Sequence, residues 1–142
     1  MNSLTNKQIM DYLDDDDIII NGIFSKDELP KNLKNGFYVV NMQNSNDGNG
    51  THWVALYFDN ISCYFDSFGF VPPEEIENKA KPYIYNKKDI QSISSSSCGF
   101  YCIAFIKYLN KSKDKPKDYL TFINLFNTYD KDENERILQG LL

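Results

Sequence analysis

One stretch constrains the fold of this chain more than any other. It is the serine run Ser94–Ser97, followed at once by Cys98 and then by an apolar segment. Apolar residues recur in that segment at spacings of three and four up to Leu109, which predicts a helix from Cys98 to about Asn110. Ser97 stands where an N-cap residue belongs. The serines offer no side chain for a core, so we expect a flexible approach that leads into a packed helix.

The place of Cys98 in the first turn of that helix suggests a nucleophile. Unpaired backbone N–H groups and the positive end of the helix dipole both favour a thiolate there. Gly99 has no side chain and would let a substrate backbone approach closely. The alternative is that Cys98 is a small buried core residue, which is the commoner role of a cysteine outside a disulfide.

The composition excludes several classes of protein. A chain of 142 residues with 42% hydrophobic and 15% aromatic residues predicts one folded domain, over 1–142, and not a disordered segment. The net charge of −5 and the scattered lysines disfavour a nucleic-acid partner. No apolar stretch is long enough to cross a bilayer, and the first residues lack the apolar core of a signal peptide. Three cysteines, an odd number, indicate a reducing compartment and no disulfide framework.

The order of the expected elements predicts the α+β class. We expect helices at 3–13, 74–81, 98–110, 118–128 and 132–141, and strands at 37–42, 51–58, 62–68, 83–85 and 89–92. Thr5 is the expected N-cap of the first helix, Pro73 suits the first turn of the second, and Ser25 with Glu28 has the spacing of a capping box. In the last two helices we expect the following apolar residues to face the body: Leu120, Ile123, Leu125, Phe126, Ile137, Leu138 and Leu141.

Two polar segments are interpreted as connections. The acidic run Asp14–Asp17 lacks the alternating spacing and the turn glycine of a calcium loop, so we expect a solvated linker and no metal site. The glycine-rich segment 43–50 is predicted to be a loop in which mobility concentrates.

The strands at 51–58 and 62–68 predict a hairpin in the centre of the sheet, because both carry apolar residues on both faces. His52 and Asp66 lie at its open end. A two-residue loop would turn Asp66 to the face opposite His52, whereas a three-residue loop or one bulge puts both on the same face. We expect an odd-length loop or a bulge.

Four residues then form a plausible catalytic set. His52, the only histidine, could take a proton from Cys98, and Asp66 could hold its imidazole in the useful tautomer. The amide of Gln91 and the backbone N–H of Cys98 could donate to a developing oxyanion. Each residue alone has an ordinary alternative, because a lone histidine is more often structural and most glutamines lie on the surface.

The order of these residues resembles the adenovirus-type maturation proteases and the related SUMO and ubiquitin-like-protein proteases. The resemblance rests on Gly50–Trp53, Tyr64–Gly69, Gln91 and Ser97–Cys102, and spans about 36–109. It implies a papain-like, circularly rearranged α+β fold, with the cysteine at the N-terminus of a helix packed on a central sheet. It also implies the roles of six residues: His52 as general base, Asp66 as its orienting acid, Gln91 as oxyanion donor, Cys98 as nucleophile, and Trp53 and Gly99 at the substrate.

The short spacings resemble the viral maturation proteases of adenoviruses, virophages and large DNA viruses more than the cellular enzymes. The resemblance implies a cysteine endopeptidase without a cofactor that cuts capsid or core precursors near Gly or other small residues. A monomer in the host cytoplasm, the viral factory or the virion is expected, with an activator peptide left open. Cys63 and Cys102 are expected to be buried. Three alternatives stay open: an isopeptidase for a ubiquitin-like protein, an acyltransferase of the same fold, and a non-catalytic capsid or scaffold module.

Overall fold

A computed structural model of the chain describes residues 1–46 and 52–142, and the fold is α+β, as predicted. The predicted mobile loop at 43–50 falls partly on residues 47–51, outside the described ranges. The helices are α1 (Asn6–Asp15), α2 (Glu74–Ala80), α3 (Cys98–Asn110), α4 (Lys115–Asn124) and α5 (Lys131–Leu141), with one 3-10 turn, η1 (Lys26–Glu28). The strands are β1 (Gly22–Ser25), β2 (Gly36–Asn41), β3 (Trp53–Phe58), β4 (Ser62–Phe65) and β5 (Tyr83–Tyr85).

The five strands form one sheet in the order β1-β2-β3-β4-β5, so the predicted hairpin of β3 and β4 is indeed inside the sheet. Only three residues, 59–61, join these two strands, and Tyr57 pairs with Cys63 beside them. The prediction of an odd-length loop is therefore confirmed. The sequence did not reveal that β1 is a strand; it pairs parallel to β2 as one edge of the sheet.

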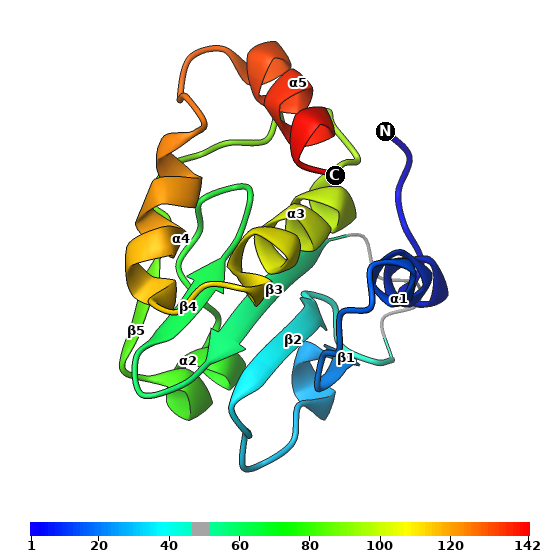
Figure 1. Cartoon of the computed structure of the whole chain (residues 1–142). Helices are drawn as coiled ribbons and strands as arrows, with labels where there is room; N and C mark the ends of the chain where they lie inside the picture. The colour runs from blue at the N-terminus through cyan, green and yellow to red at the C-terminus, as the bar shows by residue number, and fades with distance from the viewer. Residues whose placement is uncertain (47–51) are drawn as a thin grey trace.

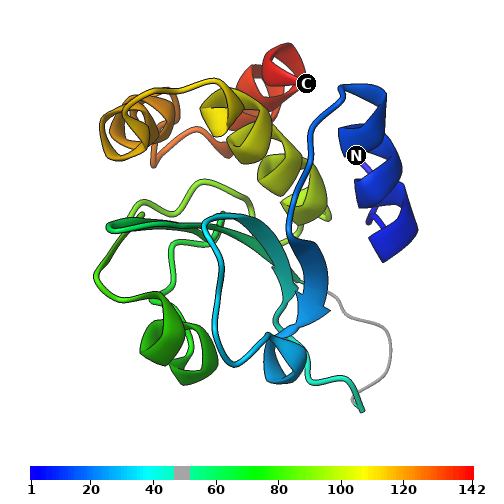
Figure 2. The same ribbon diagram turned by 60° about the horizontal axis from the view of Figure 1, so that its bottom comes forward.

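Helices cover both faces of the sheet (Figures 1 and 2). α3 crosses one face, with α1, α4 and α5 beside it, while α2 and η1 lie against the other face. Alternate residues of each strand divide between the two layers: Phe65 packs in the α3 layer, and its neighbour Tyr64 packs in the α2 layer. In the α3 layer, the rings of Phe65 and Phe105 stack with their centroids 5.5 Å apart. α3 therefore lies in the larger core cluster, and its N-terminal residue is Cys98.

Thr5 and Ser97 occupy the N-cap positions of α1 and α3, as predicted. Thr5 and Gln8 form a capping box at α1, with the Thr5 side chain accepting from the Gln8 backbone N–H. Ser25 precedes η1 without a side-chain capping bond, so the predicted box there is wrong. The helix α2 starts at Glu74, as predicted, and Pro73 is its N-cap residue, directly before the first turn.

The expected strand at 89–92 is also wrong. The backbone N–H groups of Ile90 and Gln91 both donate to the carbonyl oxygen of Ser67, which leaves them no regular ladder with a neighbouring strand. In α4, Phe122 and Ile123 are buried, but Leu120 is 58% exposed, and Leu125 just beyond the helix is 39% exposed. The buried face of α4 therefore differs from the predicted one at both leucines.

Within the described residues, no helix is both long enough and apolar enough to span a membrane.

Candidate active site

His52 and Asp66 meet at the open end of the central hairpin. His52 Nε2 lies 2.8 Å from Asp66 Oδ1, so the register that puts both on one face also brings them into hydrogen-bond contact. The backbone carbonyl of His52 accepts a bond from the Met42 N–H, which ties this residue to the end of β2. Asp66 is 1% exposed, and the His52 side chain is 17% exposed. The predicted pair therefore exists, and its imidazole is reached by solvent.

Asp66 is held from several sides. Its Oδ1 also accepts from the backbone N–H of Phe68 at 2.8 Å, and the Phe68 ring stacks on the imidazole with centroids 4.5 Å apart. Buried Asn86 holds the backbone of Asp66: its side-chain oxygen accepts from the Asp66 N–H, and its amide donates to the Asp66 carbonyl. The carboxylate therefore has one orientation, directed at His52. The sequence showed Asn86 only as part of a turn, so this role was not predicted.

The third member of the set is Cys98, at the start of α3, which lies over the beginning of β3 (Figure 1). The other ring nitrogen of His52, Nδ1, is buried and makes no hydrogen bond to the described residues. Cys98 nevertheless contributes to the raised pKa of His52, so its thiol lies near the ring. Hydrogen bonds between catalytic groups often align only when substrate binds, so this geometry is compatible with a Cys98–His52 pair.

The pKa of His52 is raised to about 9 by this environment. Burial is the largest single influence and acts in the opposite direction, because it disfavours the charged ring. The interactions with Asp66 and Cys98 together outweigh burial. The environment therefore favours the charged form of the ring.

Gln91 lies in the same region and is 2% exposed. Its side-chain oxygen accepts from the hydroxyl of Ser67 at 2.5 Å, and its Nε2 donates to the Ser95 carbonyl at 2.9 Å. These bonds connect the residue after Asp66 with the serine run before Cys98. The amide nitrogen carries a second N–H that this bond does not use. The role of Gln91 as oxyanion donor stays a prediction.

Trp53 and Gly99 both contact the segment that precedes α1. The Trp53 indole N–H donates to the Leu4 carbonyl at 2.9 Å, and a Cβ added at Gly99 would lie 3.1 Å from the Leu4 side chain. Trp53 is 7% exposed and belongs to the larger core cluster. The close approach that glycine permits is thus made by the chain's own Leu4. A direct contact of either residue with substrate stays a prediction.

Ser97 does not cap α3 in the expected way. It occupies the N-cap position, but its side chain makes no capping bond. Its hydroxyl donates instead to Glu135 of α5, at 2.8 Å. Glu135 is a second residue that the sequence did not single out, since nothing in the pattern of the last helix marks its contacts with a segment about 40 residues earlier.

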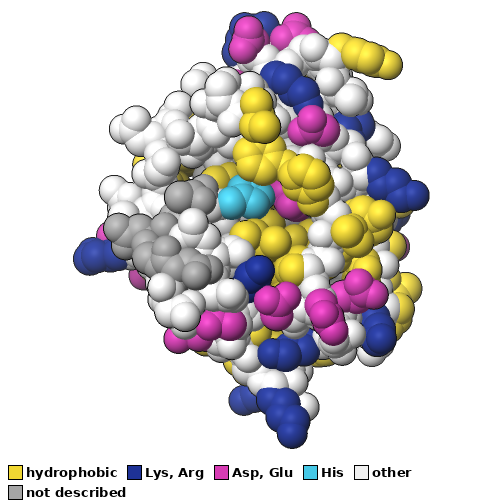
Figure 3. All heavy atoms as spheres, turned by 180° about the vertical axis from the view of Figure 1, so that it is seen from behind, with side chains coloured by type: hydrophobic (Ala, Val, Ile, Leu, Met, Phe, Trp, Pro, Cys, Tyr) yellow, Lys and Arg dark blue, Asp and Glu magenta, His cyan; other side chains and the backbone are white. Residues whose placement is uncertain are grey.

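The surface around the histidine is hollowed and apolar. Figure 3 shows its side chain in a depression bordered by hydrophobic groups. A hollow of about 200 Å³ lies next to it, and Phe68, whose ring stacks on His52, forms one wall. Its other lining residues are Phe70, Asp89, Gln91 and Ile93. The Ile93 side chain is 93% exposed and that of Phe70 is 66% exposed. The candidate site therefore adjoins an open apolar surface.

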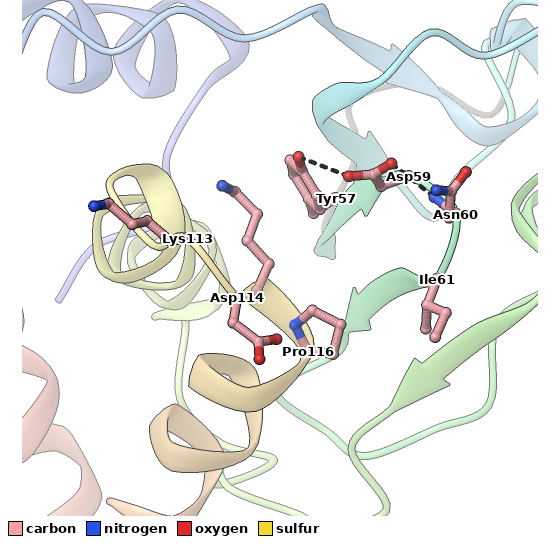
Figure 4. Close-up of a pocket in the computed structure, with 8 residues that line it drawn as sticks. Tyr57, Asp59, Asn60, Ile61, Lys113, Asp114 and Pro116 are labelled. Carbon is pink, nitrogen blue, oxygen red and sulfur yellow. Dashed lines mark hydrogen bonds between the residues drawn. The ribbon is translucent and has the colours of Figure 1, made fainter.

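A larger hollow, of about 350 Å³, lies at the opposite end of the hairpin, where the loop after β3 meets the start of α4 (Figure 4). The Tyr57 hydroxyl donates to Asp59 there, and the Lys115 ammonium lies 4.8 Å from the centre of the Tyr57 ring. None of the predicted catalytic residues lines this hollow. Among residues 1–46 and 52–142, no group of three or more acidic, histidine or cysteine side chains is placed to hold a metal ion.

No protein-family model matches the chain, and no curated protein matches it in sequence. Solved structures with a similar fold include the ASFV pS273R protease, at 22% identity and a TM-score of 0.49, over 69% of this chain and 40% of that one. The chain thus spans less than half the length of that protease.

Two bacterial structures are similar as well. The central domain of Lpg1148 from Legionella pneumophila matches over 100% of both chains, at 9% identity and a TM-score of 0.44. ChlaDub1 from Chlamydia trachomatis matches over 98% of this chain and 76% of its own, at 17% identity and a TM-score of 0.44. At these identities the likeness concerns the fold alone.

Proposed function

We propose that this chain is a cysteine peptidase that hydrolyses peptide bonds with Cys98, His52 and Asp66. One observation carries the proposal: a single imidazole is held by a buried carboxylate on Nε2 and interacts with the thiol of Cys98. A thiol, a base and an orienting acid in this order are the parts needed to make and use a thiolate nucleophile. The raised pKa of His52 supports the ion-paired form, in which the imidazole holds the proton of the thiol.

The proposed reaction has two halves. In the first, the Cys98 thiolate forms a C–S bond to the substrate carbonyl carbon, and the carbonyl electron pair moves to oxygen, near Gln91 and the Cys98 backbone N–H. The tetrahedral intermediate then expels the amine, which takes the proton from His52 and leaves a thioester. In the second half, water gives a proton to neutral His52 and attacks the thioester. The carboxylic acid leaves, and the thiolate–imidazolium pair is restored.

For the substrate, we propose a protein segment in extended form, cut next to Gly or another small residue in a viral capsid or core precursor. This finer assignment comes from the resemblance of the sequence motifs. The apolar hollow beside His52 adds a place for one larger apolar side chain of the same segment. A location in infected cells or in the virion, and activation by a peptide, belong to the same proposal.

The test is digestion of a peptide library by the wild-type chain, followed by mass spectrometry of the products. Cys98→Ala removes the nucleophile, and Cys102→Ala is the matched control one helical turn away. Cleavage by the wild type and the control, but not by Cys98→Ala, supports the proposal. Equal cleavage by Cys98→Ala contradicts it. Release of a ubiquitin-like fusion in preference to library peptides would favour an isopeptidase, and consumption of acetyl-CoA would favour an acyltransferase.

A further inference from the structure

We propose that Glu135, in the last helix, is a positioning residue that holds the nucleophile segment in its reactive geometry. The expected effect on kcat rests on the proposed function, whereas the expected effect on the order of the segment before Cys98 does not. Three hydroxyl groups converge on the one carboxylate. Ser95 and Ser97 each donate to Oε1 at 2.8 Å, and Tyr101 donates to Oε2 at 2.8 Å.

The three donors flank the proposed nucleophile, Cys98, in the sequence. Ser95 and Ser97 precede Cys98, and Tyr101 follows it in the first turn of α3. A carboxylate that holds both sides of this turn fixes where α3 begins and how its first residue is oriented. The serine run has no apolar side chains with which to pack, so hydrogen bonds must supply the order that packing gives elsewhere.

The bonds continue from Glu135 toward the predicted oxyanion donor. The Ser95 hydroxyl, which donates to Glu135, also accepts the backbone N–H of Ser97 at 3.1 Å. The Ser95 carbonyl accepts the Nε2–H of Gln91 at 2.9 Å. Glu135 therefore acts on Gln91 through Ser95, and on Cys98 through Ser97. Loss of the carboxylate would loosen both groups, although it touches neither.

The hydrogen bonds between α5 and the segment before Cys98 are expected to persist. Tyr101 is fully buried, and burial, followed by its bond to Glu135 and the charge of that carboxylate, raises the pKa of its hydroxyl. The hydroxyl therefore stays protonated and keeps donating. The preceding residue of α5, buried Asn134, donates to the Ile90 carbonyl at 3.0 Å. Asn134 and Glu135 of α5 thus hold this segment at Ile90, Ser95, Ser97 and Tyr101.

The test compares Glu135→Gln and Glu135→Ala with Glu133→Gln as control. Glu133 lies on the same helix. Its carboxylate forms a salt bridge with exposed Arg136 and, in the part of the chain that the structure describes, bonds to none of the residues 90–101. Misplacement of reacting groups by about 1 Å can cost on the order of 100-fold in rate. We expect kcat to fall about 10- to 100-fold in Glu135→Ala with KM changed less than threefold, a smaller fall in Glu135→Gln, and none in Glu133→Gln. An unchanged kcat in Glu135→Ala, or a fall equal to the unfolded fraction, would overturn the proposal.

Two further readouts do not need peptidase activity. Hydrogen exchange should rise at backbone amides 92–98 in Glu135→Gln and stay unchanged in β3, and the alkylation rate of Cys98 should change in the same variant. Ser97→Ala removes one of the three donors, so it should reproduce part of the effect and add little to Glu135→Ala. If no substrate is cleaved but exchange at 92–98 rises, the positioning role stands and the proposed function fails. Exchange that does not change in Glu135→Gln contradicts the positioning role itself.

Discussion

Two successive turns of α3 carry two buried cysteines with different neighbours. Cys98, in the first turn, is 5% exposed and lies beside an imidazole that is held by a buried carboxylate. Cys102, one turn later, is 1% exposed, and burial, followed by the charges of Cys98 and Asp66, raises the pKa of its thiol well above the usual value. The two residues share a helix and a side-chain chemistry. Only the neighbours at the end of the helix distinguish a candidate nucleophile from a core residue.

Cys63 extends the comparison to the sheet. It is fully buried in β4, and burial raises the pKa of its thiol to about 12. None of the three cysteines is in a disulfide. The chain therefore contains two protected thiols as internal references for the third.

The largest expected effect is that of Cys98→Ala, which should abolish cleavage because no other group in the site can form the thioester. The far-ultraviolet circular dichroism spectrum should stay that of the wild type, and the melting temperature should fall no further than in Cys102→Ala, since both changes remove one buried sulfur atom. Peptide cleavage followed by mass spectrometry measures the loss. Residual turnover at the wild-type rate would assign the chemistry to another residue.

Substitution of His52 or Asp66 should reduce activity less than Cys98→Ala does. His52→Ala removes the proton acceptor and should lower kcat/KM by about 10³ to 10⁴, because general acid–base catalysis is worth 10² to 10⁴. Asp66→Asn keeps a hydrogen-bonding group beside the ring and should cost less, toward the lower end of that range. Rates of peptide cleavage at one pH rank the two variants. Equal losses would mean that the carboxylate does more than orient the imidazole.

Stability should depend on pH through the same imidazole. The pKa of His52 rises from 6.5 to about 9 on folding, so the imidazole by itself favours the folded state fully below pH 6.5 and loses this contribution as the pH rises through 9. In the proposed ion pair the Cys98 thiol gives up a proton while the imidazole keeps one, which offsets the net proton uptake of the wild type. Urea unfolding of Cys98→Ala from pH 6 to 10 therefore measures the part of the contribution that Asp66 supplies, which is below about 3 kcal/mol. Asp66→Asn, which removes one source of the shift, should show a weaker loss over this range.

The smallest effect on activity is expected for Cys102→Ala. Cleavage should stay within about twofold of the wild-type rate, while the free energy of unfolding falls by about 1 to 2 kcal/mol because a small cavity replaces the buried sulfur. Parallel assays of kcat/KM and urea unfolding separate the two quantities. A folded but inactive Cys102→Ala variant would contradict the assignment of Cys98 as nucleophile and Cys102 as core residue.

The sequence revealed the parts of this molecule that depend on local patterns. The helix at Cys98–Asn110 and the strand at Tyr83–Tyr85 were predicted at their observed bounds. An odd-length hairpin loop puts His52 and Asp66 on the same face of the sheet. This prediction needed only the alternation of side chains in strands. These features follow from periods of 3.6 and 2, and such periods are visible in one sequence.

The sequence could not reveal contacts that depend on how distant segments pack. Glu135 reaches Ser97 across 38 residues, and Asn86 reaches Asp66 across 20; neither belongs to a periodic pattern. The strand expected at 89–92 had suitable residues, but the Ser67 carbonyl oxygen accepts the backbone N–H groups of Ile90 and Gln91. Leu4 packs against Gly99, a contact that the sequence did not reveal. In each case a tertiary contact decided what the local pattern left open.

The most direct test of the account is alkylation of the wild-type chain by iodoacetamide over a range of pH, with each modified cysteine identified by mass spectrometry. The account predicts fast labelling of Cys98 at neutral pH, slow labelling of Cys63 and Cys102, and a lower rate at Cys98 in His52→Ala, where the imidazolium that stabilises the thiolate is absent. Labelling of all three cysteines at similar slow rates, with no effect of His52→Ala, would contradict the claim that Cys98 and His52 form an activated pair.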